Sequence, residues 1–120
     1  MRIWCPLEVI GPHGSITIDG LVDTGFDGDV CLPIDVAIHL GLQLSSKIPV
    51  NYADGRQTTE LVFDGQVRFF GDLHRVKIIL TESETALIGT SLLENYRLLI
   101  DFRSGQVEIA KSPDGTDESV

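Results

Sequence analysis

Residues 21–28 read Leu-Val-Asp-Thr-Gly-Phe-Asp-Gly, and this stretch decides how the rest of the chain is interpreted. Leu21 and Val22 end an apolar, β-prone segment, and Asp23 follows them directly, before a turn rich in glycine and aspartate. A carboxylate at the end of a buried strand costs free energy unless it has partners or a function. The stretch Asp-Thr-Gly occurs once in the chain. Asp23 is therefore a candidate catalytic residue, and chemistry that needs two such carboxylates needs a second chain.

Short apolar segments separated by turn residues surround this stretch and predict an all-β domain. Strands are expected at residues 2–10, 15–22, 30–32, 48–52, 57–63, 66–70, 73–80, 86–88, 97–102 and 106–110. A first short helix is expected at residues 33–40, with Pro33 in its first turn and Gly41 as its stop. A second is expected at residues 91–96, and residues 64–65, Asp-Gly, form either a turn or a bulge.

The chain of 120 residues is long enough for one domain with a core and too short for two. We expect residues 1–110 to form this domain and the polar, acidic residues 111–120 to be a disordered tail. Cys5 and Cys31 lie in apolar runs, which predicts buried free thiols rather than a disulfide.

The formal net charge of −9 argues against nucleic acid and anionic membranes as partners. No apolar run approaches the roughly 18 residues that a membrane helix needs. No signal peptide is recognisable at the N-terminus, so a cytoplasmic location is the default expectation.

Other kinds of site fit the sequence less well. A calcium loop of the helix–loop–helix type needs a carboxylate at its third position and Glu at its twelfth, where a loop starting at Asp23 has Gly25 and Ile34. The histidines are dispersed over a turn, a helix and the start of a strand, so we expect no metal site. No glycine-rich phosphate loop is present, and no cofactor is expected. An ordinary acidic turn stays open as an interpretation of Asp23.

Two further stretches give Asp23 a context. Residues 51–56, Asn-Tyr-Ala-Asp-Gly-Arg, form the expected turn of a long β-rich hairpin, and residues 86–89, Ala-Leu-Ile-Gly, form an apolar element that ends in glycine. Together with residues 21–25, these stretches resemble the retropepsin-like aspartic proteases (clan AA), single-domain relatives of pepsin, in their bacterial type. The resemblance covers roughly residues 7–110 in the right order. It implies a closed, pepsin-like half-barrel with two short helices.

The resemblance also implies an activity: an aspartic endopeptidase that is a homodimer and acts on a peptide or protein substrate. Two carboxylates ~3 Å apart cannot both ionise easily, so the pair shares one proton. One carboxylate then acts as base on a water while the other acts as acid toward the carbonyl oxygen. The implied catalytic residues are Asp23, Thr24 and Gly25. Thr24 would hold the paired loops together across the two-fold axis, and Gly25 would let substrate backbone approach.

The implied substrate-binding residues are Phe26, Asp27, Tyr52, Ala53, Asp54, Gly55 and Ile88. Residues 54–55 would be the mobile tip of a flap that closes over bound peptide and excludes water. Asp27 is either a substrate ligand or a solvated turn residue, and Tyr52 either contacts substrate or packs inward. An ordinary exposed hairpin is the alternative to a flap.

The chain departs from the viral members of this family at two positions, one after Gly25 and one after Gly89. Phe26 replaces a small residue, and Thr90 stands where they carry an Arg that braces the loop. A hairpin expected at residues 97–110 also follows the second helix, so the resemblance does not define how the dimer is built. The alternative function is a non-catalytic dimeric peptide-binding module on the same fold.

Overall fold

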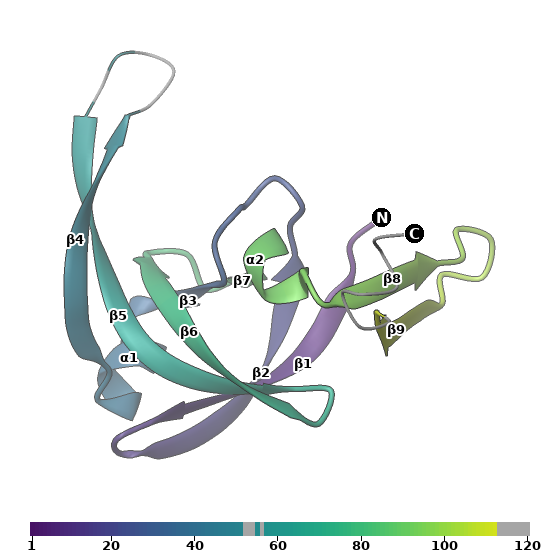
Figure 1. Cartoon of the computed structure of the whole chain (residues 1–120), viewed down its shortest axis with the longest axis horizontal. Helices are drawn as coiled ribbons and strands as arrows, with labels where there is room; N and C mark the ends of the chain where they lie inside the picture. Colours follow the sequence, from purple (N-terminus) through teal and green to yellow (C-terminus); the bar gives the residue numbers. More distant parts are fainter. Residues whose placement is uncertain (52–54, 56, 113–120) are drawn as a thin grey trace.

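The computed structural model of the chain describes residues 1–51, 55 and 57–112. Its strands and helices are β1 (Trp4–Gly11), β2 (Gly14–Val22), β3 (Val30–Pro33), α1 (Ile34–Leu40), β4 (Gln43–Asn51), β5 (Gln57–Phe69), β6 (Asp72–Thr81), β7 (Ala86–Ile88), α2 (Thr90–Leu93), β8 (Tyr96–Ile100) and β9 (Val107–Lys111). Most of the described chain is therefore β-structure, and the two helices are short, as the sequence predicts (Figure 1).

A closed barrel is the main feature of the fold. Seven strands follow the order β1-β2-β7-β3-β6-β5-β4, and β1 pairs in addition with β5. This extra pairing closes six strands into a ring, and β4 lies outside the ring on β5. The prediction of an all-β, closed half-barrel is confirmed.

The short strand β7 brings the two signature stretches together. It runs parallel to β2, with Val22 opposite Ile88, and antiparallel to β3, with Val30 opposite Ile88. The end of β2, the end of β7 and the start of β3 therefore lie at one edge of the barrel (Figure 1). This register places Asp23, which follows β2, beside Gly89, which follows β7.

The hydrophobic core lies inside the barrel, and every second side chain along a strand points into it. On β1, Cys5, Leu7 and Val9 point inward and are at most 3% exposed, and they alternate with more exposed neighbours. Cys5 and Cys31 are both buried free thiols, as predicted. Burial, with a smaller contribution from the charge of Glu60, raises the pKa of Cys31 to about 11. Among the described residues, no helix is long and apolar enough to span a membrane.

The structure corrects the interpretation of residues 64–65. Strand β5 continues through them, with Asp64 opposite Lys77 and Gly65 opposite Val76 on β6. A Cβ on Gly65 would lie 2.5 Å from Cδ1 of Ile78, so the glycine makes room for core packing rather than for a turn.

Both helices begin or end elsewhere than predicted. Pro33 is the last residue of β3, and α1 begins at Ile34, although Gly41 ends the helix in the left-handed conformation (φ 67°) as predicted. The predicted second helix at residues 91–96 is too long, because α2 ends at Leu93. Gly89 occupies the N-cap position of α2, and no side chain caps the helix.

The predicted last hairpin is present as β8 and β9, which pair only with each other among the described strands. In Figure 1 the hairpin lies to one side of the barrel, near the N-terminus. Ordered structure continues past residue 110, because Lys111 belongs to β9 and the N–H of Ser112 donates to the carbonyl of Asn95 at 2.9 Å. Residues 113–120, most of the predicted tail, lie outside the described residues.

Tyr96 attaches this hairpin to the barrel. Its hydroxyl donates to Oδ2 of Asp72 at 2.9 Å and lies 2.7 Å from Nε2 of His74. Its ring packs edge-on against Phe69, with 5.1 Å between centroids. Lys111 of β9 adds an ion pair with Asp72 at 2.8 Å. Burial, followed by the hydrogen bond to Asp72, raises the pKa of Tyr96 to about 12.

We therefore expect Tyr96 to contribute to alkaline unfolding. A tyrosine ionises near pH 10 in the unfolded chain, so a folded-state pKa of about 12 stabilises the fold below pH 10, and this stability is lost between pH 10 and 12. Tyr96→Phe removes the hydrogen bonds at a cost of about 1 kcal/mol at neutral pH, but its Tm should fall less steeply above pH 10. Thermal unfolding of both proteins from pH 8 to 12 tests this, and parallel curves would contradict it.

Candidate active site

Asp23 is held by its backbone at the end of β2. Its N–H donates to the carbonyl of Ile88 at 3.0 Å, and the N–H of Val22 donates to the carbonyl of Ile3 at 2.8 Å. The side chain is half-buried, and its Oδ1 accepts a hydrogen bond of 2.9 Å from the N–H of Gly25. Both the position and the orientation of the carboxylate are therefore fixed within one chain.

The residues after Asp23 turn sharply and stay open to solvent. The N–H of Phe26 donates to the carbonyl of Asp23 at 3.1 Å, which closes the turn. Thr24 and Gly25 are exposed. A Cβ on Gly25 would lie 3.2 Å from Oδ1 of Asp23, so a side chain there would crowd the carboxylate. Gly25 therefore leaves one side of the carboxylate accessible.

The start of α2 holds the far part of the loop. The carbonyl of Phe26 accepts from the backbone N–H of Thr90 at 2.9 Å and from its hydroxyl at 3.4 Å. The N–H of Ser91 donates to the carbonyl of Gly28 at 3.1 Å, and the N–H of Gly89 donates to the carbonyl of Asp29 at 2.9 Å. Thr90, where the viral proteases carry Arg, thus still braces the loop, through neutral hydrogen bonds.

The ring of Phe26 folds back onto its own loop. A Cβ on Gly28 would lie 2.7 Å from Cζ of Phe26, and a Cβ on Gly89 would lie 2.7 Å from its Cδ2. The ring is half-buried against these two glycines. Phe26 therefore supports the loop from inside, and the contact with substrate that we expect of it stays a prediction.

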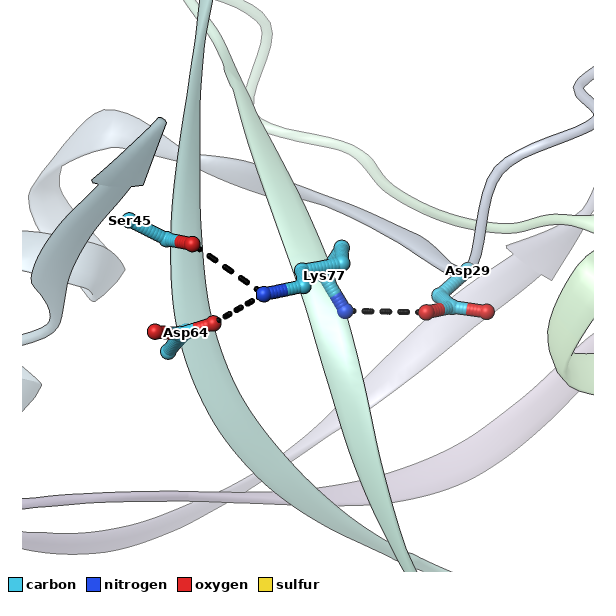
Figure 2. Close-up of polar contacts among 4 residues, drawn as sticks. All are labelled: Asp29, Ser45, Asp64 and Lys77. Carbon is cyan, nitrogen blue, oxygen red and sulfur yellow. Dashed lines mark hydrogen bonds and ion pairs between the residues drawn. The ribbon is translucent and has the colours of Figure 1, made fainter. Parts of the chain in front are cut away.

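Asp29 ties the end of the loop to β6. Its Oδ2 accepts a hydrogen bond of 2.8 Å from the backbone N–H of Lys77 (Figure 2). The side chain of Lys77 points the other way, and its Nζ lies 2.6 Å from Oδ1 of Asp64 and 3.1 Å from Oγ of Ser45. The hydrogen bond from Lys77 lowers the pKa of Asp64. Asp29 is thus a structural anchor that sequence reasoning did not assign, although its place just before a strand is a signal for such a role.

The other predicted site residues have different positions. Asp27 is exposed at the turn and forms no ion pair with a described residue, so both interpretations of it stay open. The prediction that Ile88 contacts substrate is not supported, because its side chain is fully buried in the core. Its carbonyl instead positions Asp23. Gly55 is exposed with φ 88°, and Tyr52, Ala53 and Asp54 lie outside the described residues.

The described residues place neither a metal site nor a pocket that we identify at Asp23. In the described part of the chain, no group of three or more His, Cys, Asp and Glu side chains could hold a metal ion. A pocket of about 680 Å³ lies between the end of β1, β5 and β6, and its lining includes Asp29, Arg75 and Lys77 but not Asp23. The carboxylate therefore lies on an open edge of the barrel.

No family model matches the sequence, and no curated protein matches it. Solved structures do match. The protease of simian foamy virus (mac) has a TM-score of 0.59 at 13% identity, covering 77% of this chain and 92% of that chain. The EIAV protease complexed with the inhibitor HBY-793 has a TM-score of 0.58 at 13% identity, covering 78% of this chain and 86% of that chain. The chain has the retropepsin fold.

Within this retropepsin fold, the loop that carries Asp23 is hydrogen-bonded to the start of α2, and Thr24 and Gly25 on its other side are exposed. Backbone donors from Thr90 and Ser91 fix the loop from behind, while Thr24 and Gly25 face solvent. A fixed, half-buried carboxylate beside open backbone can activate a water if a second carboxylate shares its proton. One chain supplies one such residue.

Proposed function

We propose that the chain is an aspartic endopeptidase that acts as a homodimer, with Asp23 of each subunit in the catalytic pair. The observation that carries this proposal is the setting of Asp23, which is half-buried, oriented by the N–H of Gly25 and flanked by exposed Thr24. The likeness of the fold to two retroviral proteases supports it. A bacterial type of protease and a cytoplasmic location stay predictions.

In the proposed dimer, a two-fold axis passes between the two Asp23 carboxylates. The pair binds one water and shares one proton, so its titration belongs to the pair rather than to either residue. The ionised carboxylate takes a proton from the water as the water attacks the peptide carbonyl, and the protonated carboxylate gives its proton to the carbonyl oxygen. The amine then leaves with a proton returned by the pair.

The rigid support of the loop matters to this mechanism. Attack by water needs both carboxylates in place before substrate binds, and a displacement of ~1 Å costs a large part of the rate. Hydrogen bonds from Thr90, Ser91 and Gly89 hold the loop, and Lys77 holds Asp29 at its end. These hydrogen bonds give a preorganised site.

The hairpin of β4 and β5 is the proposed flap. β4 pairs only with β5 and lies outside the closed ring, so the far end of the hairpin extends away from the barrel (Figure 1). Side chains from Gln43 to Pro49 are exposed. A peptide bound between the two subunits would lie under this hairpin, and its closure would exclude water from the reaction.

The proposal is tested with a peptide library and a statine-type transition-state analogue. We expect cleavage that the analogue abolishes and that falls more steeply than linearly on dilution, because the active species is a dimer. Turnover is measured from pH 4 to 8. Cleavage that resists the analogue would contradict the proposal. A dimer that binds the analogue and cleaves nothing at any pH would favour the non-catalytic peptide-binding module instead.

A further inference from the structure

The hairpin of β8 and β9 presents apolar side chains that the barrel does not cover. Leu99 in the middle of β8 is 64% exposed, and Phe102 just beyond its end is 73% exposed. An isolated two-stranded hairpin is marginally stable in water, and large exposed apolar side chains that lie close together mark interaction surfaces. This segment is therefore a candidate for a protein interface.

The register of the hairpin defines its two faces. Arg97 pairs with Ala110 and Leu99 pairs with Glu108, and these four exposed residues form what we term the outer face. The alternate residues of both strands form the opposite face and, apart from the exposed Lys111 at the end of β9, are half-buried. The outer face thus combines a central Leu99 with one cation and one anion on diagonal positions.

The two charged side chains of the outer face are available to a partner. Neither Arg97 nor Glu108 forms an ion pair with another residue that the structure describes. Their charges cancel, whereas the chain as a whole carries −9. Two copies of such an acidic chain repel each other over most of their surface. The repulsion is smallest at a face without net charge, such as the outer face.

We propose that the outer face is a self-complementary interface that joins two copies of this chain. In a two-fold arrangement, Leu99 of the two copies meet, and Arg97 of each faces the partner's Glu108. The partner is a second copy because the face carries both halves of each ion pair. This inference rests on the proposed homodimeric function, and it names the surface that builds the dimer.

The hairpin of β8 and β9 lies close along the chain to α2, so contact between two outer faces would affect the position of the Asp23 loop. β8 begins at Tyr96, shortly after α2 ends at Leu93. The start of α2 is bonded to the Asp23 loop through Thr90 and Ser91. The chain between the outer face and the catalytic loop is therefore short and anchored at both ends, by Tyr96 on one side and by α2 on the other.

Charge exchange tests the interface. Arg97→Glu and Glu108→Arg each create two like-charge contacts across the two-fold axis, so we expect each to raise the dimer Kd roughly tenfold. The double variant Arg97→Glu/Glu108→Arg restores the pairs with their direction reversed and should return within about threefold of the wild-type Kd. Sedimentation equilibrium measures the Kd, and circular dichroism verifies the fold of each variant.

A matched pair of apolar-to-acidic substitutions gives an independent measurement. Leu99→Glu should raise the dimer Kd by at least about tenfold, because it places two carboxylates together at the axis. Ile38→Glu is the control, since Ile38 is 72% exposed and belongs to α1, a helix on the opposite side of the barrel from the hairpin (Figure 1). Its dimer Kd should match that of the wild type.

The outcomes separate this inference from the proposed activity. Single variants with wild-type Kd, or a double variant no tighter than the singles, overturn the interface even if the enzyme cleaves peptides. A wild-type dimer that depends on Arg97 and Glu108 but cleaves nothing supports the interface and overturns the activity. A wild-type chain that stays monomeric at every concentration, with substrate and without, overturns both.

Discussion

Asp23→Asn is expected to abolish peptide cleavage while leaving the fold and the dimer intact. The amide nitrogen cannot take a proton from the water, so the pair loses its base, and general acid–base catalysis of this kind contributes about 10²–10⁴ in rate. The fold survives because Asn retains an oxygen at Oδ1, which still accepts the N–H of Gly25. Two inactive loops are then held in the wild-type geometry.

The measurement is turnover of the preferred library peptide, with Tm and dimer Kd recorded in parallel. Asp19→Asn is the matched control, because Asp19 is an exposed residue of β2 and lies on the strand that leads to Asp23. It makes the same change of charge and should keep wild-type turnover. Mixed dimers of wild-type and Asp23→Asn subunits should also be inactive, since the reaction needs both carboxylates. Full turnover by Asp23→Asn would exclude Asp23 as the catalytic residue.

Local sequence signals were sufficient where local chemistry decides the structure. The hairpins at both ends of the chain and the turn after Asp23 were predictable, because turn residues and alternating apolar residues mark them. The same local signals gave a wrong prediction at residues 64–65. Asp-Gly favours a turn, but Asp64 and Gly65 pair with β6, and β5 continues through them without interruption. Tertiary pairing overrode the local preference, which sequence patterns do not report.

The candidate site also has a part that the sequence predicts and a part that only the folded structure identifies. Asp23, Thr24 and Gly25 are adjacent, so their chemistry can be recognised in the sequence. The groups that hold the loop lie far along the chain: the Thr90 hydroxyl bonds across 64 residues and the Lys77 N–H across 48. Most of them are backbone N–H groups, which every residue except proline carries, so no residue type marks them. Only the close approach of chains in the folded structure identifies them.

Gly89→Ala is expected to disrupt both the fold at α2 and any activity. Gly89 has extended backbone angles (φ −96°) that alanine adopts freely, so space rather than conformation decides the outcome. Its Cβ would overlap the carbonyl oxygen of Gly28 and lie 2.8 Å from that of Phe26. Both oxygens accept the hydrogen bonds that join the loop to α2. Relief requires separation of these backbones, at about 1–3 kcal/mol of stability and at least roughly 100-fold in turnover.

Gly28→Ala provides the matched control because its obstacle is a side chain. The three atoms nearest to a Cβ at Gly28 would all belong to the ring of Phe26, with Cζ at 2.7 Å. In a Phe26→Ala background the ring is gone, so we expect Gly28→Ala to become nearly neutral. Gly89→Ala should stay costly in that background, because the carbonyl oxygen of Gly28 still opposes it. Unfolding free energies of the wild type, the three single variants and the two double variants give the two coupling energies. Equal relief of both substitutions by Phe26→Ala would show that the ring, and not the backbone, sets the spacing between the Asp23 loop and α2.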